Sequence, residues 1–258
     1  MNIAVRELTL FCNALTFLTR LPAPPFIQID PKFLTKSVRY FPLVGVLVGS
    51  LAALSFVALQ WLFPLQLAVL LSMAVTVLAT GGFHEDGLAD SCDGFGGGYL
   101  RQDILTIMKD SRIGTFAALG MFFVLAIKWT ALVHLLDTAI IAMAMIIGHG
   151  LSRLNAIHIM ALLPYIEGQR TVKIEAVTNG DNTRCLVFAH LSLLAFALLA
   201  GMTFEFTTIA LLYFSLSMVL LWSYIFFKKR LQGYTGDCLG AVQQMSELVI
   251  YLVLLAAI

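Results

Sequence analysis

The chain has 258 residues, of which 60% are hydrophobic and only 12% are charged, and its formal net charge is +1. Soluble domains carry about 25% charged residues, so most of the surface of this chain does not face water. The near-neutral charge provides no basic surface for a nucleic acid. Four cysteines without a Cys-x-x-Cys pair argue against a disulfide framework or a zinc knuckle.

Seven apolar stretches predict transmembrane helices, because a bilayer core about 30 Å thick requires about 20 apolar residues per helix. They are residues 42–60, 65–83, 114–136, 138–163, 185–201, 204–227 and 239–258. Residues 3–19 predict a shorter helix that is interfacial or re-entrant, and the prolines at 22, 24 and 25 end it. The expected fold is an all-α, polytopic integral membrane helical bundle that forms a single domain over residues 1–258. Gly45 and Gly49 form a Gly-x-x-x-Gly pattern that favours helix packing.

The basic residues predict the orientation of the chain in the membrane. All but two of the 16 lysines and arginines lie before the first predicted span or in alternate loops, at 101–112, 170–184 and 228–230. The opposite loops and the C-terminus carry none. Because cytoplasmic loops are enriched in lysine and arginine, we expect a cytoplasmic N-terminus and an external C-terminus.

Three aspartates after the second predicted span form the most informative pattern. Asp86, Asp90 and Asp93 are spaced i, i+4, i+7, so they share one face if the segment is helical. Three like charges on one face repel each other, and carboxylates suit magnesium, calcium or manganese. The pattern therefore favours a metal site for phosphoryl transfer at the membrane surface, and the alternative is a solvated acidic loop. Glu85 points about 100° away from Asp86 and is either a supporting residue or without a role.

Two further segments on the same side contain charged residues. Lys109 and Arg112 precede the third span, where Arg112 either clamps a phosphate or, with Lys109, anchors the helix at the headgroups. Asp237, among glycines before the last span, is either a metal ligand or a helix cap. Lys128, Arg153 and Glu247 fall at membrane depth, where an unpaired charge is costly, so each pairs with a neighbour or contacts an anionic substrate.

From His84 to Gly94 the chain reads His-Glu-Asp-Gly-Leu-Ala-Asp-Ser-Cys-Asp-Gly, which resembles the most recognisable motif of the cobalamin synthase family. Other segments resemble that family in the same order along the chain: 17–24, 41–45, 108–115 and 235–240, together with Lys128, Ser152–Arg153 and Glu247. The segment 164–184 departs from the family, because the Gly-Leu-Gly sequence expected there is missing.

The resemblance implies a transferase that joins α-ribazole, or α-ribazole 5′-phosphate, to adenosylcobinamide-GDP and releases GMP. It implies Mg²⁺ as cofactor and a multi-pass location in the prokaryotic cytoplasmic (inner) membrane, with the active site on the cytoplasmic side. The expected partners are the two substrates, the lipid bilayer and other enzymes of cobalamin assembly, with no nucleic acid.

The resemblance also assigns roles to residues of this chain. Metal binding is expected at Asp86, Asp90, Asp93 and Asp110, and Asp237 is an alternative to Asp110. Asp93 is expected to take the proton of the attacking hydroxyl, and Arg112 and Lys109 to stabilise phosphate charge. Substrate contacts are expected at His84, Lys128, Arg153, Asp237 and Glu247.

Two other classes of membrane protein share some of these features. A CDP-alcohol phosphotransferase has an Asp-Gly-x-x-Ala run, which Asp86–Ala89 resembles, but Asp90 stands where that family has Arg. A transporter would line its pathway with Lys128, Arg153 and Glu247, yet transporter sites lie near the midplane, whereas the aspartates here lie at the ends of spans. A purely structural subunit would leave the clustered aspartates unexplained.

Overall fold

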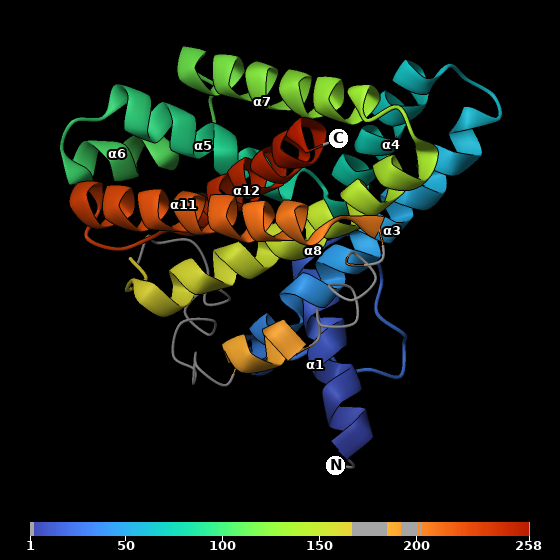
Figure 1. Cartoon of the computed structure of the whole chain (residues 1–258). Coiled ribbons are helices and arrows are strands. Elements are labelled where there is room, and N and C mark those ends of the chain that lie inside the picture. The colour runs from blue at the N-terminus through green and yellow to red at the C-terminus, as the bar shows by residue number, and fades with distance from the viewer. Residues whose placement is uncertain (1–2, 167–184, 192–200, 202, 258) are drawn as a thin grey trace.

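The computed structural model describes residues 3–166, 185–191, 201 and 203–257, and within these ranges the protein consists of helices without a β-strand (Figure 1). The main helices are α1 (Ile3–Leu18), α3 (Phe41–Gln60), α4 (Leu65–Thr80), α5 (Phe83–Gly97), α6 (Arg101–Met108), α7 (Thr115–His134), α8 (Thr138–Leu162), α11 (Phe206–Arg230) and α12 (Gly236–Ala256). The all-α prediction is therefore confirmed.

Five of the described helical segments are long and apolar enough to cross a membrane. They are Leu34–Gln60, which contains α3, and α7, α8, α11 and α12. Each of the helices α3, α7, α8, α11 and α12 begins and ends within three residues of the corresponding predicted span. The predicted span 185–201 falls mostly outside the described residues.

The second predicted span, 65–83, is not one straight helix. Helix α4 ends at Thr80, and the chain turns by 90° into α5, which begins at Phe83. Gly81 and Gly82 make the turn, each with φ of 71°, a left-handed conformation that residues with a side chain rarely adopt. The pair α4–α5 is therefore a broken span or a re-entrant segment, and the predicted count of seven spans becomes five or six in the described part of the chain.

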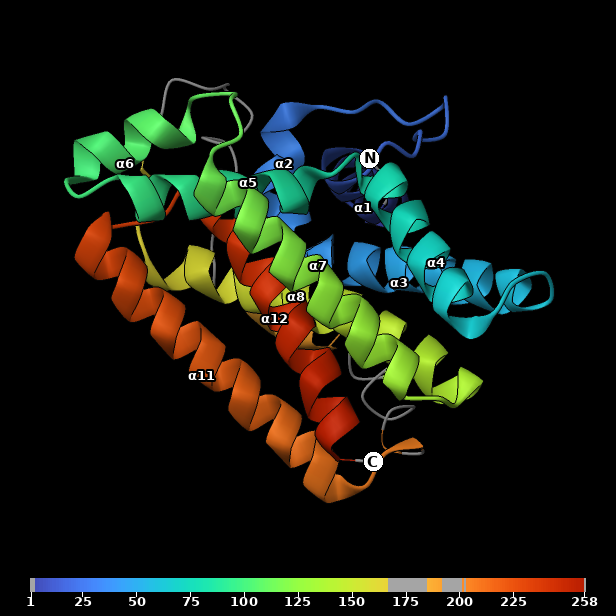
Figure 2. The same ribbon diagram turned by 90° about the horizontal axis from the view of Figure 1, so that it is seen from above.

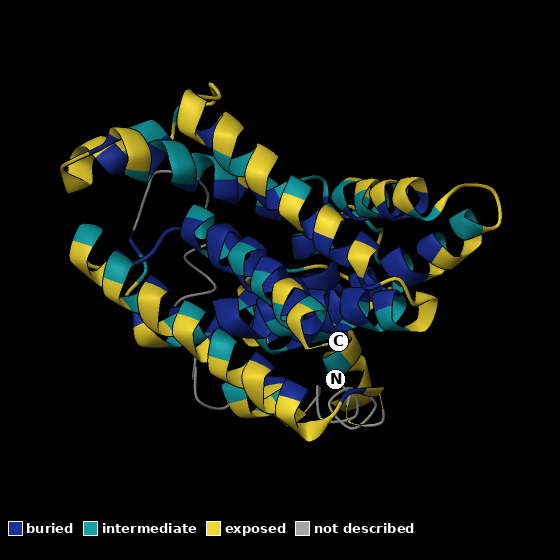
Figure 3. Cartoon of the chain, turned by 45° about the horizontal axis from the view of Figure 1, so that its top comes forward, coloured by how far each residue is buried: buried dark blue, intermediate teal, exposed yellow. Residues whose placement is uncertain are grey.

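Helices α8 and α12 form the centre of the bundle. They pack against each other, α3 lies along α8, and α5 lies along α12. Seen from above, α12 runs between α7 and α11 (Figure 2). The outer faces of α7 and α11 are exposed (Figure 3), and they are apolar, with exposed residues such as Phe122, Phe123, Phe214 and Trp222. Exposed apolar faces that run along a whole helix indicate contact with lipid rather than with water.

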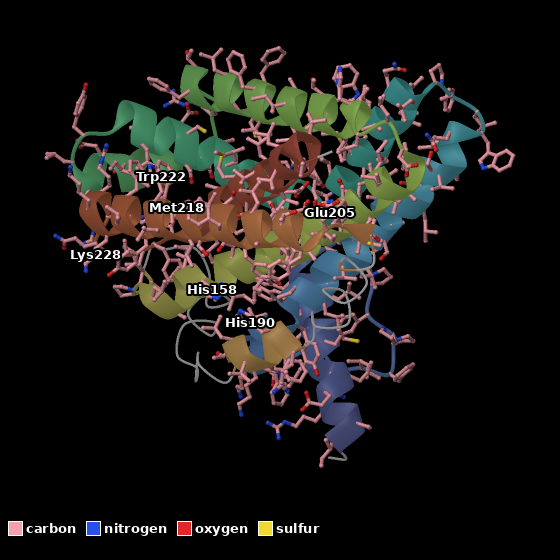
Figure 4. All side chains as sticks on the ribbon, viewed as in Figure 1. His158, His190, Glu205, Met218, Trp222 and Lys228 are labelled. Atoms are coloured by element: carbon pink, nitrogen blue, oxygen red, sulfur yellow. The ribbon has the colours of Figure 1, made fainter. Side chains whose placement is uncertain are left out.

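The charges of α11 agree with a helix that crosses the membrane. Glu205 precedes the helix and Lys228 lies in its last turn, and the exposed Met218 and Trp222 lie between them (Figure 4). No charged residue occurs between 206 and 227. A helix of 25 residues is about 37 Å long, which exceeds the apolar thickness of a bilayer.

Two of the segments predicted to share one side, the end of α11 and the α5–α6 connection, contact each other. Arg230 at the end of α11 donates a hydrogen bond of 2.6 Å to the backbone oxygen of Gly98, before α6. At the opposite end of the bundle, the Thr138 hydroxyl donates to the Gln60 side chain over 3.0 Å. The predicted basic loop at 170–184 lies outside the described residues, and the orientation of the chain in the membrane stays a prediction.

Glycines set two of the closest helix contacts. A Cβ on Gly49 would lie 2.7 Å from the backbone oxygen of Met145 in α8, which confirms the packing role predicted for the Gly-x-x-x-Gly pattern of α3. Where α5 crosses α12, a Cβ on Gly87 would lie 3.0 Å from the backbone oxygen of Asp237 and 3.1 Å from Cα of Gly240. The second crossing holds the acidic helix against the centre of the bundle.

We predict that Gly49→Ala lowers the free energy of unfolding by about 1–3 kcal/mol, because the new methyl group overlaps the backbone of α8. Reversible denaturation of the protein in detergent, followed by circular dichroism, measures the change. The matched control is Gly201→Ala, where among the described residues the new Cβ meets only Ile209 at 3.8 Å. Equal stability of the two variants would contradict the packing role.

Candidate functional site

The three aspartates of α5 line one large cavity. The cavity has a volume of 640 Å³, and Asp86, Asp90 and Asp93 face it together with Asp110 and Arg112 from the α6–α7 connection. The expectation that the three aspartates share a helical face is confirmed. The cavity lies where α4 turns into α5, because Gly81 and Gly82 also belong to its wall.

Asp93 ties α5 to the start of α7. Its Oδ2 accepts a hydrogen bond of 2.6 Å from the Gly114 backbone N–H, and its Oδ1 accepts one of 2.8 Å from Ala117. These are N–H groups that a helix leaves without partners in its first turn. A Cβ on Gly114 would lie 2.6 Å from Asp93 Oδ1, so the glycine of the Lys-Asp-Ser-Arg-Ile-Gly segment makes room for this cap.

Arg112 and Asp110 form an exposed ion pair at the mouth of the cavity. The Arg112 Nη2–Asp110 Oδ2 distance is 2.5 Å, and Arg112 Nε donates to both oxygens over 3.0 and 2.9 Å. Hydrogen bonds from Arg112 lower the pKa of Asp110, and the same contacts raise the pKa of Arg112. The Arg112 side chain is 88% exposed. A phosphate that uses this guanidinium would therefore share it with Asp110.

The donors of the cavity fit a hard divalent cation. Asp86, Asp90, Asp93 and Asp110 offer oxygen atoms only, which is the ligand type that magnesium takes. In the part of the chain that the structure describes, no three acidic, histidine or cysteine side chains already converge on one point. A metal here would complete its shell with water and phosphate oxygens, as magnesium commonly does.

Lys128 and Glu247 form an ion pair inside the bundle rather than in the acidic cavity. The Lys128 Nζ–Glu247 Oε1 distance is 2.8 Å, and both residues are 3% exposed. Glu247 also accepts hydrogen bonds from Gln243 over 2.7 Å and from the Tyr251 hydroxyl over 3.1 Å. Lys128 and Glu247 were predicted either to pair with a neighbour or to contact an anionic substrate, and in the described structure they pair with each other.

Glu85, which sequence reasoning left without a defined role, links this buried ion pair to the cavity. Its side chain lines the cavity beside Asp86, and its Oε1 accepts a hydrogen bond of 2.9 Å from Gln244. Gln244 in turn accepts a hydrogen bond of 2.8 Å from Lys128. The two amides Gln243 and Gln244 were also missed, although adjacent amides in an apolar span are a recognisable signal of a polar network.

The remaining predicted site residues lie apart from the acidic cavity. His84 and Arg153 line a second, smaller cavity, and Phe83 belongs to the walls of both. Asp237 lies in the first turn of α12 but is not its cap, because the Thr235 hydroxyl accepts from the Cys238 N–H over 3.3 Å. Lys109 follows α6, is exposed, and is not among the residues that line the large cavity.

Comparisons with known proteins cover nearly the whole chain. A family model described as "Cobalamin-5-phosphate synthase" matches residues 10–255. A protein of Shewanella frigidimarina named adenosylcobinamide-GDP ribazoletransferase is 41% identical over 254 residues, which cover 98% of this chain and 96% of that protein. A Shewanella pealeana protein of the same name is 42% identical over 97% of this chain and 96% of its own length. No solved structure matches the chain.

We predict that Lys128→Met lowers the free energy of unfolding by about 3–5 kcal/mol, because it leaves the buried carboxylate of Glu247 without its cation. The double variant Lys128→Met/Glu247→Gln should regain part of this loss, since it removes the unpaired charge. Denaturation in detergent measures both changes.

The control is Lys229→Met on the exposed end of α11, for which we expect a change within about 0.5 kcal/mol. If Lys128→Met were as stable as this control, the buried ion pair would have no structural role.

Proposed function

We infer that this chain, which belongs to the cobalamin-5-phosphate synthase family, transfers ribazole or its phosphate to adenosylcobinamide-GDP with release of GMP. The observation that carries the inference from family to chemistry is the acidic cavity. Five carboxylates, those of Glu85 and four aspartates, and one exposed guanidinium face a space of 640 Å³ at one end of an apolar bundle. Such a site can hold the pyrophosphate of a nucleotide-activated substrate against a cation.

The proposed reaction is a displacement at phosphorus. A ribose hydroxyl of ribazole attacks the phosphorus nearest the cobinamide, a new P–O bond forms, and the P–O bond to GMP breaks. The hydroxyl proton passes to a carboxylate of the cavity, and GMP carries away the bridging oxygen. We assign the proton to Asp86 rather than to Asp93, because Asp86 is exposed in the cavity and both oxygens of Asp93 already accept backbone N–H groups.

The aspartates and the basic residues of the site have different roles in binding the pyrophosphate. We propose that Asp86, Asp90 and Asp110 would hold Mg²⁺, and that Asp93 would contribute while it positions the start of α7. When bound, the ion would offset the negative charge that develops on the phosphate oxygens. Arg112 would bind a phosphate oxygen with the N–H donors that Asp110 leaves open, and Lys109 would add positive charge nearby.

The test of this function is release of GMP by the purified protein supplied with adenosylcobinamide-GDP, α-ribazole and magnesium. We expect Asp86→Asn and Asp90→Asn to lower turnover by about a hundredfold or more, as loss of a group that acts in the transition state does. Their free energy of unfolding should stay within about 0.5 kcal/mol of the wild-type value, because both side chains line the open cavity rather than the packed core.

The matched control is Asp103→Asn, an exposed aspartate at the start of α6 that does not line the cavity. It should keep normal turnover and the same dependence on magnesium concentration. Near-normal turnover and magnesium dependence in Asp86→Asn and Asp90→Asn would overturn the assignment of these acids.

We propose that the acidic cavity faces the cytoplasm from the inner membrane, because it opens beside the segments that carry the lysines and arginines. A reporter active only in the cytoplasm should therefore be inactive when fused after Ile258, whereas a reporter active only outside should function there. The same pair of reporters inserted at Tyr99, an exposed residue between α5 and α6, is the control and should give the opposite pattern. Cytoplasmic activity at Ile258 would reverse the orientation.

A further inference from the structure

An apolar groove, here called the α5–α11 groove, lies between α5, α11 and α12. Helices α5 and α11 meet at their ends, where Arg230 binds Gly98, and they diverge toward their starts (Figure 2). The groove has a volume of 200 Å³, the space of about six or seven water molecules or of methylene groups of similar size. The residues that α5 contributes to it point about 180° away from the three aspartates of the acidic cavity. Helix α5 therefore separates the acidic cavity from an apolar groove.

The aromatic and basic residues of α11 place the groove at the level of the membrane interface. Trp222 lines the groove, is 58% exposed and stacks on Phe226, with ring centroids 5.0 Å apart. Lys228, Lys229 and Arg230 follow in the last turn of the helix. Tryptophan and lysine side chains gather where the acyl chains of a bilayer end and the headgroups begin. The groove is thus level with the glycerol and the upper acyl chains of a phospholipid.

The end of α11 offers positive charge beside the groove. Lys228 and Lys229 are exposed, and the half-buried guanidinium of Arg230 lies 5.9 Å from the ring centroid of Phe95, which lines the groove. One N–H group of Arg230 donates to the backbone oxygen of Gly98, and a guanidinium carries several more. In the part of the chain that the structure describes, no acidic residue lines the groove. This charge distribution complements an anionic headgroup.

Ser91 is a buried hydroxyl without a partner on the wall of the groove. It is 5% exposed, and its Oγ makes no hydrogen bond with any described residue. A buried donor that lacks an acceptor is costly, so a ligand that brings an acceptor gains by binding there. Ser91 precedes Phe95, the residue beside Arg230, by four positions, which is about 6 Å along α5. A phosphate at Arg230 and an ester carbonyl at Ser91 match the order of these groups in a phospholipid.

We propose that the α5–α11 groove binds one anionic phospholipid. The upper part of one acyl chain would occupy the groove, and its ester carbonyl would accept a hydrogen bond from Ser91. The phosphate would lie beside Arg230, and Lys228 and Lys229 would favour an anionic headgroup over a zwitterionic one. The lipid would contact the face of α5 opposite to the aspartates, whatever reaction the acidic cavity performs.

The first arm of the test varies the charge of the headgroup. Native mass spectrometry of the delipidated protein, titrated with phosphatidylglycerol or phosphatidylcholine of identical chains, measures the Kd of the first bound lipid. We expect phosphatidylglycerol to bind about tenfold or more tightly than phosphatidylcholine. Lys228→Gln/Lys229→Gln should lose this preference. The matched control Lys32→Gln/Lys36→Gln removes the same charge from exposed lysines before α3 and should keep it. Equal affinity of the wild-type protein for the two lipids would overturn the proposal.

The second arm varies the ester carbonyl. A dialkyl ether phosphatidylglycerol has the same phosphate and chains but no carbonyl, so the wild-type protein should bind it about threefold to tenfold more weakly than the diacyl lipid. Ser91→Ala should bind the two lipids equally. Its thermal stability without lipid should be at least that of the wild-type protein, because it removes an unsatisfied buried hydroxyl. The control Ser217→Ala, on the exposed side of α11, should keep the preference for the diacyl lipid, since the Ser217 hydroxyl already donates to the Tyr213 backbone oxygen over 2.7 Å.

Two further outcomes would overturn the proposal. One is an unchanged preference for the diacyl lipid in Ser91→Ala. The other is a lipid-free dimer that Trp222→Ala dissociates, because the groove would then bind a second copy of the chain. Neither arm requires GMP release, so failure of the proposed function would leave this test intact.

Discussion

The bend between α4 and α5 determines where the acidic side chains that α5 contributes to the large cavity lie. Gly81 and Gly82 take consecutive left-handed conformations, and the chain turns by 90° instead of continuing along the axis of α4. A straight helix would carry Asp86, Asp90 and Asp93 away from α7 and α12. The turn lays α5 across the bundle, so that Gly87 can meet Gly240 and Asp93 can reach the start of α7.

The polar groups inside the bundle follow from the absence of water there. A charge at this depth must be neutralised and hydrogen-bonded within the protein. Glu247 achieves this with Lys128, Gln243 and Tyr251, which come from α7 and α12. Gln244 and Glu85 extend the same network to the cavity wall. The network therefore connects the stability of the bundle centre to the position of one acidic side chain at the site.

Two cavities of opposite character meet at Phe83. The larger is lined by carboxylates and an arginine, and the smaller by aromatic rings with a buried arginine at one end. Membership of the cobalamin-5-phosphate synthase family also decides between the alternatives raised from the sequence, since neither a CDP-alcohol phosphotransferase nor a transporter explains a family match over residues 10–255. Because Lys128 and Glu247 pair with each other inside the bundle, their presence at membrane depth is explained without a transport pathway.

The sequence by itself determined the properties that depend on local patterns. Apolar run length predicted the membrane helices, the i, i+4, i+7 spacing predicted one acidic face, and the motif around His84–Gly94 indicated the family. Only the tertiary structure decided which charges meet. Lys128 forms an ion pair with Glu247, and both oxygens of Asp93 accept hydrogen bonds from backbone N–H groups at the start of α7. Arg153 lines a different cavity from the aspartates. These pairings join residues far apart in the chain through helix crossings, and crossing geometry depends on where glycines let backbones approach, which periodicity along a single helix does not contain.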